Sequence, residues 1–267
     1  MEKRKVSLSV IIPTYNVEIF IGPLLSQIMP WANEVIICDS YSTDSTLEIA
    51  GKYDVRIMQH EYINSASQKN WALTQTSHDW VFIIDADELP EPQLLHEIDS
   101  FLADIPQGVE LAYIPRKNKF WGELPGNGVN YPDYQSRLFN KRFGKYQEKE
   151  VHAQVVSEGQ SICLKHALIH DDFTDISSWW LRNNRYFKYE LIELTRNKKR
   201  WNRKMQYIKP LYVFFKVYLQ KKMFKYGFKG FFAAFQWAVY YFFVYAKLYE
   251  FELKEKQIIN EKSANPY

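Results

Sequence analysis

The chain has 267 residues, of which 46% are hydrophobic and 17% aromatic, and this composition excludes a globally disordered protein. Its two cysteines, Cys38 and Cys163, are too few for a disulfide framework or a zinc site and fit a reducing compartment. The net charge of +3 is unremarkable, and the polar residues 1–5 lack the apolar region of a signal peptide. We therefore expect a protein that stays in the cytoplasm or on the inner face of the membrane.

The first part of the chain alternates short apolar runs with segments of helical periodicity. Strands are expected at residues 7–12, 34–38, 55–58 and 80–84. The intervening segments, residues 17–29, 44–53 and 64–76, are expected to form helices. Because parallel strands need crossovers of about this length, the pattern predicts an α/β fold with a mostly parallel sheet.

The following segment is less regular. Pro90 and Pro92 begin an expected helix that ends near Ala103, and a further strand is expected at residues 111–115. Residues 117–133 are rich in Gly, Pro, Asn and aromatic side chains, which predicts a long functional loop. Two shorter strands, in antiparallel pairing, are expected at residues 135–140 and 151–156.

Two carboxylates, Asp85 and Asp87, follow directly on the apolar run of residues 80–84 and flank the small Ala86. In an open α/β sheet, ligands bind at the carboxyl ends of the strands. Neighbouring carboxylates repel each other unless a cation neutralises them, and their hard oxygens suit Mg²⁺ or Mn²⁺. The pair therefore predicts a divalent-cation site that carries substrate phosphates; the alternative is a solvated turn.

From about residue 175 the chain becomes basic and aromatic. Between residues 182 and 229, fifteen Lys and Arg stand against only Glu190 and Glu193. Residues 230–246 carry no charge, but this stretch is short for a spanning helix of about 20 residues. We expect helices that lie on an anionic membrane surface. The alternatives are packing on the rest of the chain or on a second subunit of a homo-oligomer, and a true span; no motif supports nucleic-acid binding.

Four polar motifs occur in order along the first half: PTYN at residues 13–16, DSYSTDST at 39–46, QKN at 68–70 and DADE at 85–88. This ordered set resembles the family 2 glycosyltransferases, which are inverting enzymes with the GT-A fold. The motifs YPDYQSRLF at 131–139, VHA at 151–153 and LIH at 168–170 resemble one branch of that family. That branch comprises the β-glucosyltransferases that extend the inner-core heptose of lipopolysaccharide.

The resemblance implies a GT-A catalytic domain at residues 1–175, with a nucleotide-sugar half at about 7–90 and an acceptor half at about 91–175. Residues 176–267 would form a helical, membrane-associating region. The donor-binding residues of the catalytic domain would be Pro13, Thr14, Tyr15, Asn16, Asp39, Ser40, Lys69, Asp85 and Ala86. Among them, Asp39 would accept hydrogen bonds from the uracil. Asp87 would bind Mn²⁺ or Mg²⁺ with His170 as a second ligand, and Trp121 and Arg137 would contact the acceptor.

Inversion by direct displacement requires a general base at the acceptor hydroxyl. The candidates, in order of preference, are Glu150, Asp133 and His152. Many relatives have an acidic residue directly after the His of the VHA motif, whereas this chain has Ala153 there. The identity of the base is therefore open at this point.

The expected reaction is metal-dependent transfer of a hexose, glucose from UDP-glucose, to a membrane-anchored lipopolysaccharide core saccharide. The enzyme would be peripheral on the inner face of the bacterial inner membrane. Alternatives are a polyprenyl-phosphate sugar transferase and a family 2 transferase for capsule or another glycan. A nucleotidyltransferase is disfavoured, because residues 13–16 stand where its Gly-rich phosphate loop would be. A membrane scaffold with a degenerate transferase domain is disfavoured by the intact Asp39, Asp85 and Asp87.

Overall fold

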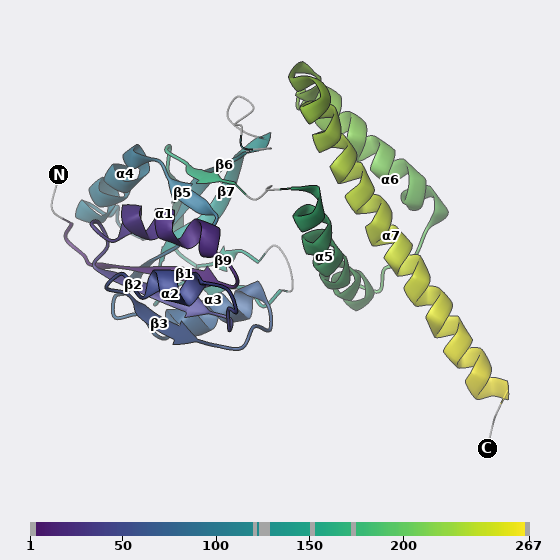
Figure 1. Cartoon of the computed structure of the whole chain (residues 1–267), viewed down its shortest axis with the longest axis horizontal. Coiled ribbons are helices and arrows are strands. Elements are labelled where there is room, and N and C mark those ends of the chain that lie inside the picture. Colours follow the sequence, from purple (N-terminus) through teal and green to yellow (C-terminus); the bar gives the residue numbers. More distant parts are fainter. Residues whose placement is uncertain (1–3, 120–121, 123–128, 150–152, 172–174, 265–267) are drawn as a thin grey trace. The chain divides into compact units, whose positions relative to one another are not determined.

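The structure is a computed structural model, and it describes residues 4–119, 122, 129–149, 153–171 and 175–264. These residues form two units, one built from residues 4–119 and 129–171 and the other from residues 175–264. Each unit is described by itself below, and Figure 1 shows the elements of both.

The first unit is built on a mixed sheet with strand order β3-β2-β1-β4-β7-β6-β11-β5, in which β10 also pairs with β6. Its strands are β1 (Leu8–Thr14), β2 (Glu34–Asp39), β3 (Arg56–Gln59), β4 (Trp80–Ile83), β5 (Glu88–Pro90), β6 (Val109–Asn118), β7 (Val129–Asn140), β10 (Gln160–Cys163) and β11 (Leu168–His170). The first four strands are parallel, whereas β7 runs antiparallel to both β4 and β6. A separate two-stranded sheet pairs β8 (Lys145–Tyr146) with β9 (Val155–Val156). The α/β class and the mostly parallel sheet are thus confirmed.

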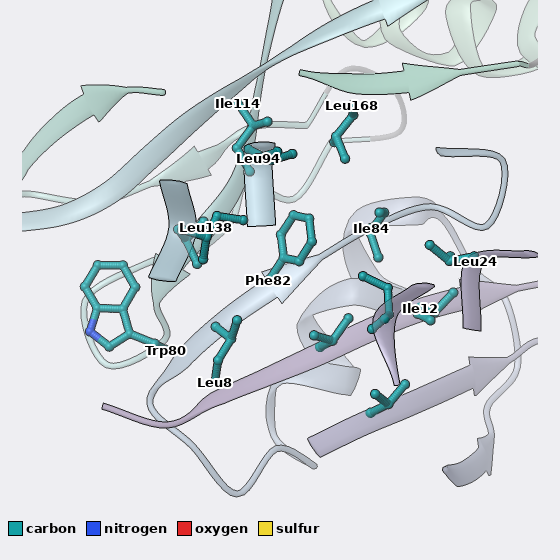
Figure 2. Packing of buried hydrophobic residues seen from close by; sticks show 14 of the residues in the cluster. Leu8, Ile12, Leu24, Trp80, Phe82, Ile84, Leu94, Ile114, Leu138 and Leu168 are labelled. Carbon is teal, nitrogen blue, oxygen red and sulfur yellow. The ribbon is translucent and has the colours of Figure 1, made fainter. Parts of the chain in front are cut away.

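Both faces of the central strands are buried, which explains why these strands are continuously apolar. Leu8 and Ile12 of β1 pack with Phe82 of β4 on one face (Figure 2). This face is covered by α1 (Glu18–Ile28) and α4 (Pro92–Ala103), whose buried side chains belong to the same cluster. Ile11 points to the opposite face, where α3 (Ser65–Leu73) contributes buried residues. Successive residues of a strand point to opposite faces, so β1 anchors both layers.

Three sequence predictions in this unit are wrong in extent. Of the strand expected at residues 151–156, the described residues contain only β9 (Val155–Val156), and it pairs with β8. The helix expected at residues 44–53 is only α2 (Thr46–Ala50), because Asp44 accepts hydrogen bonds from the backbone N–H of Thr46 (3.0 Å) and Glu18 (3.1 Å) and so forms a turn. The long loop expected at residues 117–133 is shorter, since β6 continues to Asn118 and β7 begins at Val129. Polar residues at these strand ends pair with one another across the sheet, which concealed the strands from pattern analysis.

The second unit consists of helices. They are α5 (Ile176–Arg196), α6 (Arg203–Phe215), a π-helical turn η1 (Lys216–Gln220), a 3₁₀ turn η2 (Met223–Tyr226) and α7 (Gly227–Ala264). Figure 1 shows α6 alongside α7, where the Gln206 side-chain amide donates to the Phe242 carbonyl (3.1 Å). Trp180 of α5 packs its ring against Phe243 of α7, with centroids 5.1 Å apart. In the part of the chain that the structure describes, no helix combines the length and apolarity needed to cross a bilayer.

Candidate active site

The carboxyl ends of β1 and β2 are joined around Asp39, whose side chain is fully buried. Its carboxylate accepts hydrogen bonds from the Thr14 hydroxyl (2.9 Å), from the backbone N–H and hydroxyl of Ser42 (2.9 and 2.5 Å) and from the Gln59 amide (3.3 Å). The Ser40 backbone N–H donates to the Thr14 carbonyl (2.9 Å), so the two strand ends are held together. These bonds fix the carboxylate in one orientation at the edge of the sheet.

Two tyrosines follow these strands and are about half exposed. Tyr15 comes directly after β1 and is 51% exposed, and Tyr41 lies two residues beyond β2 and is 56% exposed. Their loops are fixed by Asn16, which adopts a φ of 51° and accepts a hydrogen bond from the Thr43 backbone N–H (2.8 Å). Pro13 lies within β1, in register with Cys38 of β2. Exposed rings on a fixed loop can stack on a planar base.

Seven charged side chains gather near the end of β4, and we call them the carboxylate cluster. They come from α3, the turn after β4, β5, β6 and β7. They are Asp85, Asp87, Glu88, Asp133, Lys69, Arg116 and Arg137. Within it, Arg137 contacts both Asp85 and Glu88 (2.7 Å to Glu88), and Lys69 contacts the other oxygen of Asp85 (3.0 Å). Arg116 bridges Glu88 (3.2 Å) and Asp133 (2.8 Å). Three basic groups thus face three of the four acidic ones in a continuous network.

Burial of this network shapes its protonation. The Arg137 side chain is 4% exposed and that of Glu88 is fully buried. Burial alone would raise the pKa of Asp85, but Arg137 and Lys69 hold that pKa well below its usual range. Burial lowers the pKa of the Lys69 ammonium, which Asp85 opposes. Burial also raises the pKa of the adjoining Tyr146 phenol, which donates to the Ser136 carbonyl (3.0 Å). Asp85 is therefore a fixed anion between two cations.

Asp87 differs from its neighbours, because its ion-pair partner among the described residues is a histidine. His170 Nε2 lies 3.4 Å from an Asp87 carboxylate oxygen. Against the effect of burial, the hydrogen bond from His170 lowers the pKa of Asp87. The Asp171 backbone N–H also donates to the Asp87 carbonyl (3.1 Å), which joins the end of β11 to the DADE turn. The negative charge of Asp87 is thus balanced less completely than that of Asp85, which contacts both Lys69 and Arg137.

The His170 ring is oriented by Asn118. The Asn118 side-chain amide donates to Asp133 (3.2 Å), which turns its carbonyl oxygen toward His170 Nδ1 (2.7 Å). Nδ1–H is then the donor of that bond, so Nε2 donates to Asp87 when the ring is protonated, whereas in the neutral ring Nε2 carries a lone pair directed at Asp87. Two acceptor atoms this close need a proton or a cation between them. The pair therefore fits a divalent cation that takes oxygen and imidazole ligands.

A metal at this point would need further ligands from outside the described residues. No three His, Cys, Asp or Glu side chains of the described segments come together in a geometry able to hold an ion. Catalytic metal sites keep positions open for substrate, and Mg²⁺ commonly completes its shell with phosphate oxygens and water. An Asp–His pair at the edge of the sheet suits that kind of open site.

The predicted residues of this region occupy different settings. Ala86 is buried, and Ser40 accepts a hydrogen bond from the Gln68 amide (3.0 Å), so both contribute to the framework of the site. Asp133 is held by Arg116, and against the effect of burial this arginine lowers the pKa of Asp133. Arg137, predicted to contact the acceptor, is enclosed by Asp85 and Glu88 instead. Glu150, His152 and Trp121 lie outside the described residues.

Four residues of the site carried no role in the sequence prediction: Glu88, Arg116, Asn118 and Tyr146. Glu88 was visible as the last residue of the DADE motif, and its full burial shows that it organises the motif. The other three come from β6 and β8 and reach the site only through the fold. A polar residue at the end of an expected strand was the one available signal for Arg116 and Asn118.

Comparison with known proteins places the chain in a family. The family model described as "Glycosyl transferase family 2" matches residues 9–168. An uncharacterized glycosyltransferase of Rickettsia felis is 28% identical over 273 residues, covering 96% of this chain and 94% of the relative. The lipopolysaccharide core biosynthesis glycosyltransferase LpsC of Rhizobium meliloti is 29% identical over 255 residues, covering 92% and 93% respectively.

Among solved structures, the chain is similar to glucosyl-3-phosphoglycerate synthase from Mycobacterium tuberculosis. That crystal structure contains Mn²⁺, UDP and glucosyl-3-phosphoglycerate. The two share 24% identity with a TM-score of 0.38, and the likeness covers 43% of this chain and 45% of the other.

Proposed function

The chain belongs to glycosyl transferase family 2, and from this premise we propose that it transfers glucose from UDP-glucose to a saccharide of the lipopolysaccharide core. The acceptor class is supported by the near full-length similarity to LpsC, together with the YPDYQSRLF, VHA and LIH motifs. The reaction would be inverting and dependent on Mn²⁺ or Mg²⁺. The observation that carries the metal dependence is the 3.4 Å approach of His170 Nε2 to Asp87.

The donor would bind across the ends of β1, β2 and β4. We propose that Asp39 accepts a hydrogen bond from the uracil, beside the exposed ring of Tyr15. Both Asp39 oxygens are already engaged, so the uracil N–H would displace one present donor. The Gln59 amide is the natural one to leave, because its bond (3.3 Å) is longer than those of Thr14 and Ser42.

Asp87 and His170 would hold the divalent cation, which when bound would stabilise the negative charge of the departing diphosphate. Asp85 would support the metal site without binding the cation itself. Its carboxylate is fixed between Lys69 and Arg137, so it would fix the DADE turn and place Asp87. Asn118 would keep the His170 Nε2 lone pair directed at Asp87.

The acceptor hydroxyl would attack the anomeric carbon and form the new glycosidic bond. UDP would leave with the electron pair of the broken C–O bond, and a general base would take the hydroxyl proton. Asp133 is poorly suited to that task, because its two hydrogen bonds from Arg116 (3.0 and 2.8 Å) stabilise the anion and lower its pKa. We therefore propose Glu150 as the base and Asp133 as a positioning residue for Asn118.

The test is a panel of UDP-sugars with heptose-containing lipopolysaccharide core as acceptor, with and without Mn²⁺ or Mg²⁺, in which released UDP is measured. Metal-dependent consumption of UDP-glucose alone would support the proposal. Consumption of a different UDP-sugar would retain the reaction class and discard glucose. Binding of UDP without turnover would favour a polyprenyl-phosphate acceptor, and absence of both would contradict the proposal.

The lipopolysaccharide acceptor is anchored in a membrane, so we also propose that the protein works as a peripheral enzyme at the inner membrane face. The basic and aromatic composition of residues 175–264 supports this location. It would serve a polyprenyl-phosphate acceptor equally well, so it does not discriminate between the two acceptor classes.

A further inference from the structure

The second unit has no acidic residue between Glu193 and Glu250, although this interval contains thirteen Lys and Arg. Five of these cations are concentrated where the chain turns from α6 through η1 and η2 into α7. We call residues 215–231 the helical tip. A concentration of one sign of charge on so short a segment calls for an anionic partner.

The helical tip is a folded element with its own small core. Val217 and Met223 are buried, and Lys222 adopts a left-handed φ of 57° between the two turns. Gly230 is required for the close approach of α7 to this turn, because a Cβ at that position would lie 1.8 Å from the Met223 carbonyl oxygen. The backbone of the tip is therefore held in one conformation, which keeps its outer residues on one segment of the surface.

That outer surface interleaves exposed apolar side chains with exposed cations. The apolar set is Phe215, Leu219, Phe224, Tyr226, Phe228 and Phe231. The cations are Lys216, Lys221, Lys222 and Lys225. Large apolar side chains gathered on a surface mark an interaction site. Lysines interleaved with aromatic and leucine side chains are typical of segments that lie in the interface of an anionic bilayer.

We propose that the helical tip docks the protein onto an anionic lipid bilayer, with its lysines at the phosphate level and its apolar side chains among the acyl chains. Charge complementarity favours this occupant over a second copy of the chain, because two tips would bring ten lysines of like charge together. The proposal deepens the proposed function, which calls for an enzyme held at a membrane. Its test uses neither donor nor acceptor, so the two can fail separately.

The experiment is co-sedimentation of the full chain with vesicles of phosphatidylglycerol and phosphatidylcholine, compared with vesicles of phosphatidylcholine alone. The tip variant carries Lys→Gln at Lys216, Lys221, Lys222 and Lys225. Its matched control loses the same charge from four exposed lysines of the first unit, Lys5, Lys52, Lys145 and Lys165. Because each of the four lysines adds to the attraction of an anionic surface, we expect at least a roughly 100-fold loss of affinity for the tip variant. The control should stay within about twofold of the wild type, since exposed charges away from the bilayer are screened.

A second variant, Leu219→Ser with Phe224→Ser, tests the apolar part. It should lose the vesicle binding that persists for the wild type at high salt, and far-ultraviolet circular dichroism checks that its helices are intact. Three outcomes would overturn the proposal: no preference of the wild type for anionic vesicles, equal losses in tip variant and control, or a lipid-free dimer that the tip variants convert to monomer. The last would make this surface an interface between copies of the chain.

Discussion

In the first unit, the charged side chains of the carboxylate cluster are wholly or partly buried and face fixed partners. In the second unit, four of the five lysines of the helical tip are exposed, and no carboxylate lies within eighteen residues of them along the chain. Burying a charge without a partner is expensive, so the carboxylate cluster must be internally matched. Exposed charges carry no such requirement, and their common sign is available for an external partner. Charge thus serves as internal framework in one unit and as recognition surface in the other.

The largest effect is expected at Asp87, the one carboxylate of the cluster to which we assign metal binding and not a structural role. Asp87→Ala should reduce transfer at least about a thousandfold, because the developing charge on the diphosphate loses its stabilisation. Folding should be almost unchanged, since the variant leaves no arginine or lysine unpaired. Release of UDP measures the activity, and thermal unfolding checks the fold. Asp104→Ala is the matched control, because the Asp104 side chain is 93% exposed. An active Asp87→Ala protein would contradict the mechanism.

The next prediction compares a buried cation with an exposed one. Arg137→Met should destabilise the protein by about 3 kcal/mol or more, because Glu88 and Asp85 lose the cation that they share inside the fold. Lys221→Met removes an exposed cation of the helical tip and should change the free energy of unfolding by less than about 0.5 kcal/mol. Urea unfolding measures both. Similar losses for the two variants would refute the contrast drawn between the units.

A smaller effect is expected at Asn118, which orients His170 without joining the ion pairs. Asn118→Leu removes the acceptor of the Nδ1–H bond and should weaken Mn²⁺ binding in the presence of UDP by about 10–100-fold. Isothermal titration calorimetry measures this affinity directly. Asn197→Leu, in the second unit, is the control and should leave the affinity unchanged. Unaltered Mn²⁺ binding by Asn118→Leu would remove His170 from the proposed metal site.

The parts of the site that could be predicted are those that a short stretch of sequence specifies. Asp85 and Asp87 follow an apolar strand, and their position at the end of β4 was legible from that run alone. The helix from Pro92 to Ala103 was likewise predicted to within about two residues, since its proline start is a local signal.

The parts that could not be predicted depend on pairing between distant segments. Arg116 lies 28 residues from Glu88, and Arg137 lies 52 from Asp85. Only the order of the strands in the sheet brings these charges together, because β7 lies beside β4 and β11 alone separates β6 from β5. Local patterns treat such residues as solvated. The polar start of β7 was therefore taken for a loop, because the partners of Asp133 were not visible in its neighbourhood.

The smallest expected effect concerns Glu34, a carboxylate of the first unit with an arginine partner. Its contribution to the free energy of unfolding should depend on pH. Burial raises the pKa of Glu34, but hydrogen bonds from Ser9, Ser77 and Arg56 outweigh it and lower the pKa from 4.5 to about 2. A folded-state pKa below the unfolded value gives stability that is present above about pH 4.5 and is lost as the pH falls toward 2. Since Arg56 is half exposed, we expect Glu34→Gln to lose only about 1–2 kcal/mol at pH 7.

Urea unfolding between pH 3 and 7 measures the free energy of unfolding of wild type and Glu34→Gln. The difference between the two should decrease as the pH is lowered. Glu250 of the second unit is the informative counterpart. Lys254 (2.7 Å) and Lys247 (3.1 Å) lower its pKa in the same direction, but all three side chains are exposed. Water and salt screen such contacts, so Glu250→Gln should lower the free energy of unfolding by less than Glu34→Gln does, and this loss should disappear at high salt. If Glu250→Gln and Glu34→Gln lowered the free energy of unfolding by equal amounts, hydrogen bonding and burial would not explain the difference between the charges of the two units.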